Sequence, residues 1–306
     1  MPRLLLATHG GASAEGASRM AWLLARRLNA PLDVVCVFEP IPPVDFGFAV
    51  TMPPTAEEEA GVKQEIREDV RGQLASCGID GAAPIERSGP AATEIAAAAR
   101  LAHSDLVVLG LGPHGALDRA LGGETALQLV QQASTPVLAV PGTASELPRR
   151  TVAAIDFTPT SVRAARTLAK VLQPGDELHL VHVHTWTEPD LVVHASSWLA
   201  PPEASDSLVG EQRLAELAAS LPLAAGVEAH MVEVEGSPAP ALLEYADRVH
   251  AELIALGSHG YGLWKRLTIG SVSSKILRVA TCCVLVQPLG SLATLEGVGV
   301  SKRQGG

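Results

Sequence analysis

The stretch SDLVVLGLGPHG at residues 104–115 returns as AELIALGSHG at residues 251–260. A second stretch, LGGETALQLVQQASTPVLAVP at 121–141, returns as TIGSVSSKILRVATCCVLVQP at 268–288. Both pairs are separated by about 147 residues, which marks an internal repeat of the chain. The sequence therefore predicts two copies of one folding unit, which follow one another along the chain.

Each copy opens with a short apolar run, RLLLATH at 3–9 and TVAAID at 151–156, and then alternates helical with strand-like segments. Most strand-like segments are apolar throughout, as expected for a parallel sheet that helices cover on both faces. We therefore predict an α/β fold, made of two tandem five-stranded parallel-sheet α/β/α sandwiches of Rossmann-like type. The expected domains are 1–147 and 148–290. A Gly- and Ser-rich flexible tail is expected at 291–306.

The composition excludes several classes of protein. The 306 residues suffice for about two domains, and 47% hydrophobic residues are too many for a disordered chain. A net charge of −10 and only 3% aromatic residues argue against binding of nucleic acid. Four cysteines form no disulfide framework in a chain of this length, and no apolar run is long enough for a membrane span or a signal peptide. We expect a cytoplasmic protein without membrane insertion.

A glycine-rich loop in the second copy follows the apolar strand LIALG. It runs from Gly257 to Gly260, continues for nine residues and resumes as Gly270-Ser271-Val272-Ser273, where a helical segment begins. A helix N-terminus presents unpaired N–H groups, glycine permits close approach of an anion, and the serine hydroxyls add donors. The loop is therefore a candidate phosphate cradle. The alternative is that these glycines only form turns and caps.

The spacing Gly257-x2-Gly260-x9-Gly270-Ser271 resembles the nucleotide-binding motif of the universal stress protein family, and the resemblance extends over both copies. It implies a tandem universal stress protein that binds ATP, or AMP or ADP, as a regulatory or sensor module in the stress response. Mg²⁺ is expected to accompany the phosphates. The resemblance implies site roles for one acid at the end of the first strand, one adenine-packing residue and one phosphate and ribose loop: Asp156, Val183, Gly257, Gly260, Gly270, Ser271, Val272 and Ser273.

Asp156 has a second interpretation. Its carboxylate is able to accept a hydrogen bond from a ribose hydroxyl or an adenine amine. The alternative to this ligand contact is that Asp156 caps the helix that starts at Pro159, although Thr158 is the nearer N-cap candidate.

The first copy departs from the motif. His9 stands where Asp156 stands in the second copy, and Gly115 is followed by seven rather than nine residues before Gly123. Glu124 replaces Ser271, and a carboxylate at a helix N-terminus repels phosphate. Our hypothesis is that the first copy is a degenerate, non-binding domain.

Binding rather than turnover is the expected activity, because the sequence contains no paired carboxylates and no positioned nucleophile. Slow ATP hydrolysis is the most that it suggests, and no catalytic residue is assigned. Two rivals stay open: a nucleotide hydrolase or nucleotidyl transferase on the same scaffold, and an interaction module without nucleotide. His179, His182 and His184 gather on one segment, but strand ends near a cleft explain them better than a metal site does.

The last apolar run of each copy, 136–141 and 282–288, is expected at the edge of its sheet, where an exposed strand invites pairing. Pairing of the two runs would give an internal pseudo-dimer, and the family resemblance implies the same arrangement. A homodimer of tandem chains is a further expectation. The apolar, Pro-rich segment 40–54 predicts contact with a protein partner or with the other domain.

Overall fold

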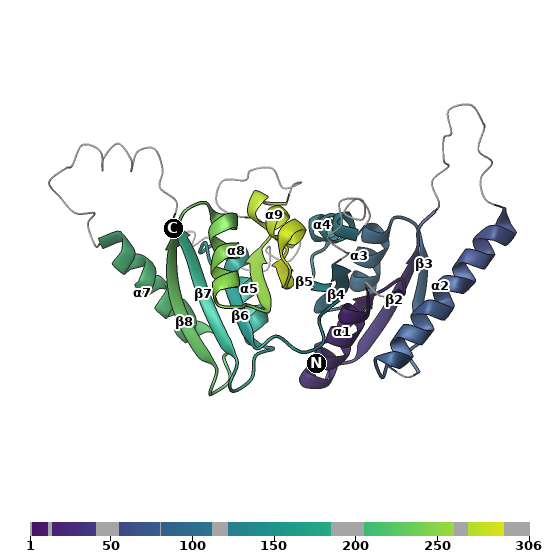
Figure 1. The fold of residues 1–306 in the computed structure, drawn as a ribbon, viewed down its shortest axis with the longest axis horizontal. Helices are drawn as coiled ribbons and strands as arrows, with labels where there is room; N and C mark the ends of the chain where they lie inside the picture. Colours follow the sequence, from purple (N-terminus) through teal and green to yellow (C-terminus); the bar gives the residue numbers. More distant parts are fainter. Residues whose placement is uncertain are drawn as a thin grey trace, which may run out of the picture.

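The computed structural model describes residues 2–11, 14–40, 55–79, 81–111, 122–184, 205–259 and 269–290. Its strands form one sheet in the order β3-β2-β1-β4-β5-β10-β9-β6-β7-β8. The first half of the chain supplies β1 to β5 and the second half β6 to β10, so a single sheet runs through both halves (Figure 1).

The elements of the first half follow the predicted alternation. In chain order they are β1 Leu4–Ala7, α1 Glu15–Leu28, β2 Leu32–Phe38, α2 Ala56–Ser76, β3 Ile85–Ser88, α3 Ala91–Leu101, β4 Leu106–Leu111, α4 Gly122–Gln132 and β5 Val137–Pro141.

The second half repeats this order. Its elements are β6 Arg150–Ala154, α5 Pro159–Ala169, β7 Glu177–His184, α7 Ser205–Ser220, β8 Glu228–Glu235, α8 Pro238–Arg248, β9 Leu253–Gly257, α9 Ser271–Val279 and β10 Cys283–Gln287.

Two apolar cores lie on the two faces of the sheet. Leu4 and Leu6 of β1 belong to one core and Leu5 to the other, because successive residues of a strand point to opposite faces. Helices α1, α2, α5 and α7 cover the first face, and α3, α4, α8 and α9 cover the second. This double cover explains why the central strands are apolar throughout, and it confirms the predicted Rossmann-like α/β/α class.

The two halves join through their last strands. β5 and β10 pair antiparallel with Val284 opposite Ala139, whereas the other strand pairs described are parallel. Helices α4 and α9 pack against each other beside this junction (Figure 1). The predicted pseudo-dimer is therefore present, with the two edge strands buried in the centre of one sheet.

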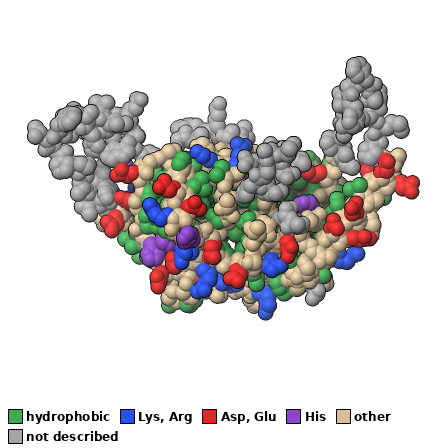
Figure 2. All heavy atoms as spheres, in the orientation of Figure 1, with side chains coloured by type: hydrophobic (Ala, Val, Ile, Leu, Met, Phe, Trp, Pro, Cys, Tyr) green, Lys and Arg blue, Asp and Glu red, His purple; other side chains and the backbone are tan. Residues whose placement is uncertain are grey.

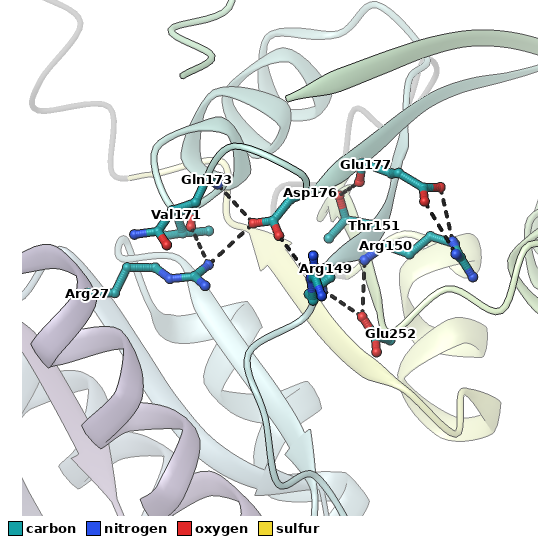
Figure 3. Close-up of polar contacts among 9 residues, drawn as sticks. All are labelled: Arg27, Arg149, Arg150, Thr151, Val171, Gln173, Asp176, Glu177 and Glu252. Carbon is teal, nitrogen blue, oxygen red and sulfur yellow. Dashed lines mark hydrogen bonds and ion pairs between the residues drawn. The ribbon is translucent and has the colours of Figure 1, made fainter. Parts of the chain in front are cut away.

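A polar contact also links the halves, on the face that α1 and α5 cover. The Arg27 guanidinium of α1 donates to the Val171 carbonyl oxygen at 2.9 Å and lies 3.5 Å from the buried Asp176 carboxylate (Figure 3). Asp176 Oδ2 also accepts from the backbone N–H of Gln173 at 2.8 Å. Its Oδ1 lies 3.6 Å from Arg149 Nε. The loop before β7 is thus held by a side chain from the first half.

Some expectations fall on residues that the structure does not describe. They are the predicted tail at 291–306, nearly all of the Pro-rich segment 40–54, and the motif residues 112–115 of the first half. Within the described ranges, none of the helices combines the length and the apolar character that a bilayer span requires.

Candidate functional site

A cleft of about 860 Å³ opens in the second half, at the carboxyl ends of β6, β7 and β9. Open α/β sheets bind ligands at this edge. Seven of the eight residues predicted from the sequence line it, and Gly260 lies outside the described residues. The seven are Asp156, Val183, Gly257, Gly270, Ser271, Val272 and Ser273.

The N-terminus of α9 forms one wall of the cleft. Its N-cap, Gly270, makes no side-chain capping bond, and its N–H donates to the Ser258 carbonyl oxygen at 2.7 Å. Among the described residues, the backbone N–H groups of Ser271, Val272 and Ser273 have no protein acceptor. The three amides and the positive end of the helix dipole therefore offer a place for an anion.

The two predicted serine donors differ in the structure. Ser271 is exposed at the first turn of α9, so its hydroxyl is open to a ligand. Ser273 is buried, and its hydroxyl donates to the Gly257 carbonyl oxygen at 2.7 Å. Because the Ser273 hydroxyl already donates to this carbonyl, it connects the start of α9 to the end of β9.

Gly257 is required by packing. A Cβ atom at this position would lie 2.6 Å from Thr160 Oγ1 and 2.9 Å from the Ser161 backbone nitrogen. Thr160 in turn donates to the His259 carbonyl oxygen at 2.9 Å. The missing side chain lets the first turn of α5 lie against the end of β9, and this contact fixes the start of the glycine-rich loop.

Asp156 supports the start of α5 and also lines the cleft. Thr158 is the N-cap of α5, and its hydroxyl accepts from the Ser161 N–H at 3.3 Å. Asp156 Oδ1 accepts from the Thr158 N–H at 3.0 Å and from the Thr158 hydroxyl at 2.6 Å. The carboxylate therefore supports the cap, while Oδ2 has no partner among the described residues and lies at the cleft.

Phe157, His182 and Arg213 are among the further residues that line the cleft. Phe157 adopts a left-handed φ of 59°, and its ring lies 5.0 Å from the His182 ring between centroids. The Arg213 guanidinium lies 3.8 Å from the Phe157 ring centroid. The His182 Nδ1–H donates to the Ile155 carbonyl oxygen at 2.7 Å, so Nε2 is the acceptor nitrogen of the neutral ring.

His259 adds a buried polar atom to this wall. Its Nδ1 lies 2.8 Å from Ser258 Oγ, whereas its Nε2 is buried without a hydrogen-bond partner among the described residues. A buried ring nitrogen without a partner is costly unless a water or a ligand meets it. His259 thus adds to the cleft lining a residue whose ring nitrogen has no partner among the described residues.

In the corresponding region of the first half, side-chain hydrogen bonds connect the end of β1 to α2. The Thr8 hydroxyl donates to Gln73 Oε1 at 2.7 Å, and Gln73 Nε2 donates to the Gly11 carbonyl oxygen at 2.9 Å. Gly10, at φ 82°, lies so close to α2 that a Cβ would be 2.7 Å from Asp69 Cβ. Helix α2 is therefore held against the end of β1, and the acid Asp69 lies at this contact.

The other candidate residues lie apart from the cleft or are used within the fold. His179 and His182 point to opposite faces of β7: His179 contacts Tyr245 of α8, and His182 contacts the Ile155 carbonyl. Cys282 and Cys283 are free thiols packed into opposite cores. Burial is the main cause that raises the pKa of Cys282 to about 11 and that of Cys283 to about 12, so both are protonated at neutral pH.

Comparison with known proteins agrees with this architecture. The sequence pattern of the Universal stress protein family matches residues 1–141 and 148–288. A universal stress protein of Mycolicibacterium smegmatis is 29% identical over 295 residues, which are 92% of this chain and 96% of the relative. One from Mycobacterium tuberculosis is 31% identical over 195 residues, 59% of this chain and 58% of the relative.

Solved structures share the fold. A universal stress protein from Archaeoglobus fulgidus superimposes with a TM-score of 0.64 at 20% identity, over 94% of this chain and 97% of that one. A universal stress protein structure from Pseudomonas aeruginosa gives a TM-score of 0.60 at 15% identity, over 94% and 93% of the two chains.

Proposed function

The chain belongs to the universal stress protein family, and from this premise we propose that its second half binds an adenine nucleotide, ATP in the first instance. Whether the cleft is occupied or empty would be the signal that the protein carries as a regulatory or sensor module. The observation that carries the proposal is the set of backbone N–H groups at Ser271, Val272 and Ser273, which face a cleft without a protein acceptor among the described residues.

The size and lining of the cleft suit a nucleotide. Its volume of about 860 Å³ lies within the range of roughly 300–1,000 Å³ typical of small-molecule sites. The amides of α9 would hold the phosphate groups, with the Ser271 hydroxyl as an added donor. In the tautomer that carries the ring proton on Nε2, His259 would donate to a phosphate or ribose oxygen, which would satisfy an otherwise unpaired group.

The opposite side of the cleft suits a base and a ribose. Asp156 Oδ2 is available to accept from a ribose hydroxyl or an amine, while Oδ1 keeps the carboxylate fixed through Thr158. Val183 and Phe157 offer apolar surface to a purine ring, and His182 Nε2 offers an acceptor. Mg²⁺ would be held by the nucleotide phosphates and water more than by protein, because Asp156 is the one carboxylate among the described lining residues.

We expect the first half to leave nucleotide unbound. Its α2 is tied to the end of β1 through Gln73, and Asp69 adds negative charge where phosphate or ribose would approach. The sequence places Glu124 at the matching helix start, which opposes phosphate by charge repulsion. The first half would then serve as the structural partner that buries the edge strand β10.

Binding without rapid turnover is the activity that the cleft supports best. General acid–base hydrolysis needs a positioned base near the attacking water. Asp156 is the one carboxylate in the described lining, and one of its oxygens already accepts two hydrogen bonds. Hydrolysis of bound ATP is therefore expected to be slow.

The proposal is tested by calorimetric titration of the full chain with ATP in the presence of Mg²⁺. We expect one ATP bound per chain. Ser271→Glu places in the second half the charge that Glu124 carries in the first, and an acid at this helix position suits the dipole, so folding is preserved. We expect this variant to bind ATP at least ten-fold more weakly.

Thr93→Glu is the matched control, because Thr93 is exposed in the first turn of α3 in the first half and the change in charge is identical. It should bind ATP like the unaltered chain. Equal binding by Ser271→Glu, or two nucleotides per chain, would contradict the assignment. Steady turnover of ATP would favour the hydrolase rival, and absence of binding together with absence of released nucleotide from denatured protein would favour the interaction module.

A further inference from the structure

A second group of polar side chains lies at the other end of β7, away from the nucleotide cleft. It consists of Glu177, His179 and His230, and each offers one ligand atom within 4.8 Å of the other two. Histidine side chains reach the surface over β7 and β8 in this part of the molecule (Figure 2). None of these three residues lines the cleft.

The register of the sheet brings the three residues together. His179 and His230 stand directly opposite each other on the parallel strands β7 and β8, and their rings stack with centroids 4.6 Å apart. Glu177 is two residues before His179 on the same face, and its Oε2 lies 3.4 Å from His179 Nε2. The cluster is therefore set by backbone geometry and not by a chance meeting of long side chains.

The first two members are held in place by a surrounding layer of contacts. His179 is buried, 7% exposed, and its Nδ1 lies 2.8 Å from the Tyr245 hydroxyl of α8. Because a phenol hydroxyl both donates and accepts, Tyr245 is able to accompany either neutral tautomer of the ring. Arg150 holds Glu177 through two contacts, Nε to Oε2 at 3.0 Å and Nη2 to Oε1 at 3.3 Å (Figure 3).

We propose that Glu177, His179 and His230 form a binding site for a divalent transition-metal ion of the Zn²⁺ class. Two imidazoles and one carboxylate are a ligand set that Zn²⁺ uses in proteins, with a water or substrate atom in the fourth position. The imidazoles disfavour Mg²⁺ and Ca²⁺, which select oxygen ligands. This site is independent of the proposed nucleotide function.

Binding of an ion needs one reorientation, because the stacked His179 and His230 rings do not yet point their nitrogens at one place. Zn²⁺ binds nitrogen and oxygen at about 2.0–2.2 Å, which requires ligand atoms roughly 3.3 Å apart. His179 Nε2 and Glu177 Oε2 already meet this separation. The residue that has to move is His230. It is exposed, so its ring can turn toward His179 and Glu177.

An ion at this site would reorganise the protons of the cluster. With Nε2 of His179 bound to the metal, Nδ1 carries the proton and donates to the Tyr245 oxygen. Arg150 would then keep the carboxylate oriented toward the ion through the contacts it already makes. The ion enters from the exposed side, past His230.

The test uses the tag-free full chain, treated with chelator and free of nucleotide, so that no phosphate carries the metal. Zn²⁺ is titrated against a chromophoric competitor, and Co²⁺ is added in parallel to report coordination by its visible absorption. We expect one Zn²⁺ per chain and a Co²⁺ spectrum with nitrogen ligands. His230→Ala removes an exposed ligand and should weaken Zn²⁺ binding at least ten-fold.

His9→Ala is the control, because His9 is an exposed histidine of the first half. It should leave Zn²⁺ binding unchanged. Glu177→Gln, which retains the shape of the side chain, should also weaken binding, with folding checked by circular dichroism. The proposal is overturned if the unaltered chain binds no Zn²⁺ at micromolar concentration, or if His230→Ala binds Zn²⁺ and shapes the Co²⁺ spectrum as the unaltered chain does.

Discussion

At the scale of single residues, the cleft depends on two glycines that have no side chain as much as on the side chains that line it. Gly257 ends β9 and leaves room for the first turn of α5, while Gly270 starts α9 without a capping side chain. Ser273 fastens the two parts through the Gly257 carbonyl. These contacts hold the end of β9 and the start of α9 against each other before any ligand arrives.

Replacement of Gly257 by Ala should destabilise the fold. The new Cβ would meet Thr160 Oγ1 at 2.6 Å and the backbone of Ser161 at 2.9 Å, and overpacking of this kind costs about 1–3 kcal/mol. Gly72→Ala is the control, because Gly72 lies in α2 with nothing within 4 Å of a Cβ, and a better helix former should raise stability by about 0.5–1 kcal/mol. Urea denaturation measures both. Equal stability of the two variants would contradict the packing role of Gly257.

The four thiols should differ strongly in reactivity. Burial is the main cause that raises the pKa of Cys36 and of Cys282 to about 11 and that of Cys283 to about 12. At pH 8 only about a thousandth or less of each is the reactive thiolate. Cys77 is half-buried at the end of α2, so one thiol per native chain should react rapidly with a maleimide, and Cys77→Ser should abolish that phase. Rapid modification of two or more thiols in the folded chain would refute this order.

The sequence identified most of the loop residues but not the aromatic wall. Gly257, Gly270 and their neighbours are readable because their spacing along the chain is fixed by one strand, one loop and one helix start. The contact of Arg213 with Phe157 is not readable in this way. It depends on the rotation of α7 about its axis and on the left-handed backbone of Phe157, and neither leaves a periodic signal.

At the scale of elements, helix ends follow local chemistry closely. The acidic run at 57–59 predicts the start of a helix, and the structure adds Thr55 as the N-cap of α2. The Thr55 hydroxyl accepts from the Glu58 N–H at 3.3 Å, and the Glu58 carboxylate accepts from the Thr55 N–H at 2.8 Å. This capping box satisfies two backbone N–H groups, those of Glu58 and Thr55, that an isolated helix end leaves open.

The capping box should make stability depend on pH in the acid range. Hydrogen bonds from Thr55, first its backbone N–H and then its hydroxyl, lower the pKa of Glu58 below its ordinary value of 4.5. Because the unfolded chain then binds the proton more readily, the contribution of Glu58 is present above the unfolded pKa and is lost as pH falls through the lower folded pKa. Glu58→Gln should therefore be less stable than the unaltered chain at pH 7, and the gap should close as pH falls through the lowered folded pKa.

Glu57→Gln is the matched control for this measurement, since it removes an adjacent charge from the same helix turn and keeps the capping box. Thermal or urea unfolding from pH 3 to 7 follows the difference. A gap between Glu58→Gln and the unaltered chain that widens toward low pH would show that the carboxylate is not stabilised by folding.

The strands show which element-level features a sequence carries. Continuous apolar runs predict the parallel, doubly covered sheet, and the central strands have buried residues on both faces. The outer strand β8 behaves differently: its residues are mixed in polarity and partly exposed, which follows from its place at the edge of the sheet. The pairing of His179 with His230 was not foreseen, because register between neighbouring strands is fixed by the fold and not by either strand alone.

At the scale of the whole molecule, two half-sheets become one through β5 and β10. The prediction of an internal pseudo-dimer from two apolar last strands is confirmed by their antiparallel register. The polar link through Arg27 could not be predicted, since it joins α1 to a turn that is distant along the chain. Such links depend on the angle at which the two halves meet.

Removal of Arg27 should weaken the junction more than removal of Arg149. Both face Asp176, whose side chain is 4% exposed, but the Arg27 side chain is 16% exposed and that of Arg149 is 69% exposed. Arg27→Ala leaves a buried carboxylate and the Val171 carbonyl with one partner fewer, at a cost of about 1–3 kcal/mol. Arg149→Ala should cost less than about 1 kcal/mol, because exposed ion pairs contribute little. Urea unfolding at pH 7 ranks the two variants, and the reverse ranking would contradict the described junction.

Amide-resolved NMR of the full chain during titration with ATP observes the three backbone amides at the start of α9 one by one. We predict that the N–H resonances of Ser271, Val272 and Ser273 move together and reach saturation at one ATP per chain, while the amides at the end of β1 in the first half stay in place. Unmoved resonances at these three positions, with binding observed at another part of the chain or nowhere, would show that these amides do not hold a nucleotide.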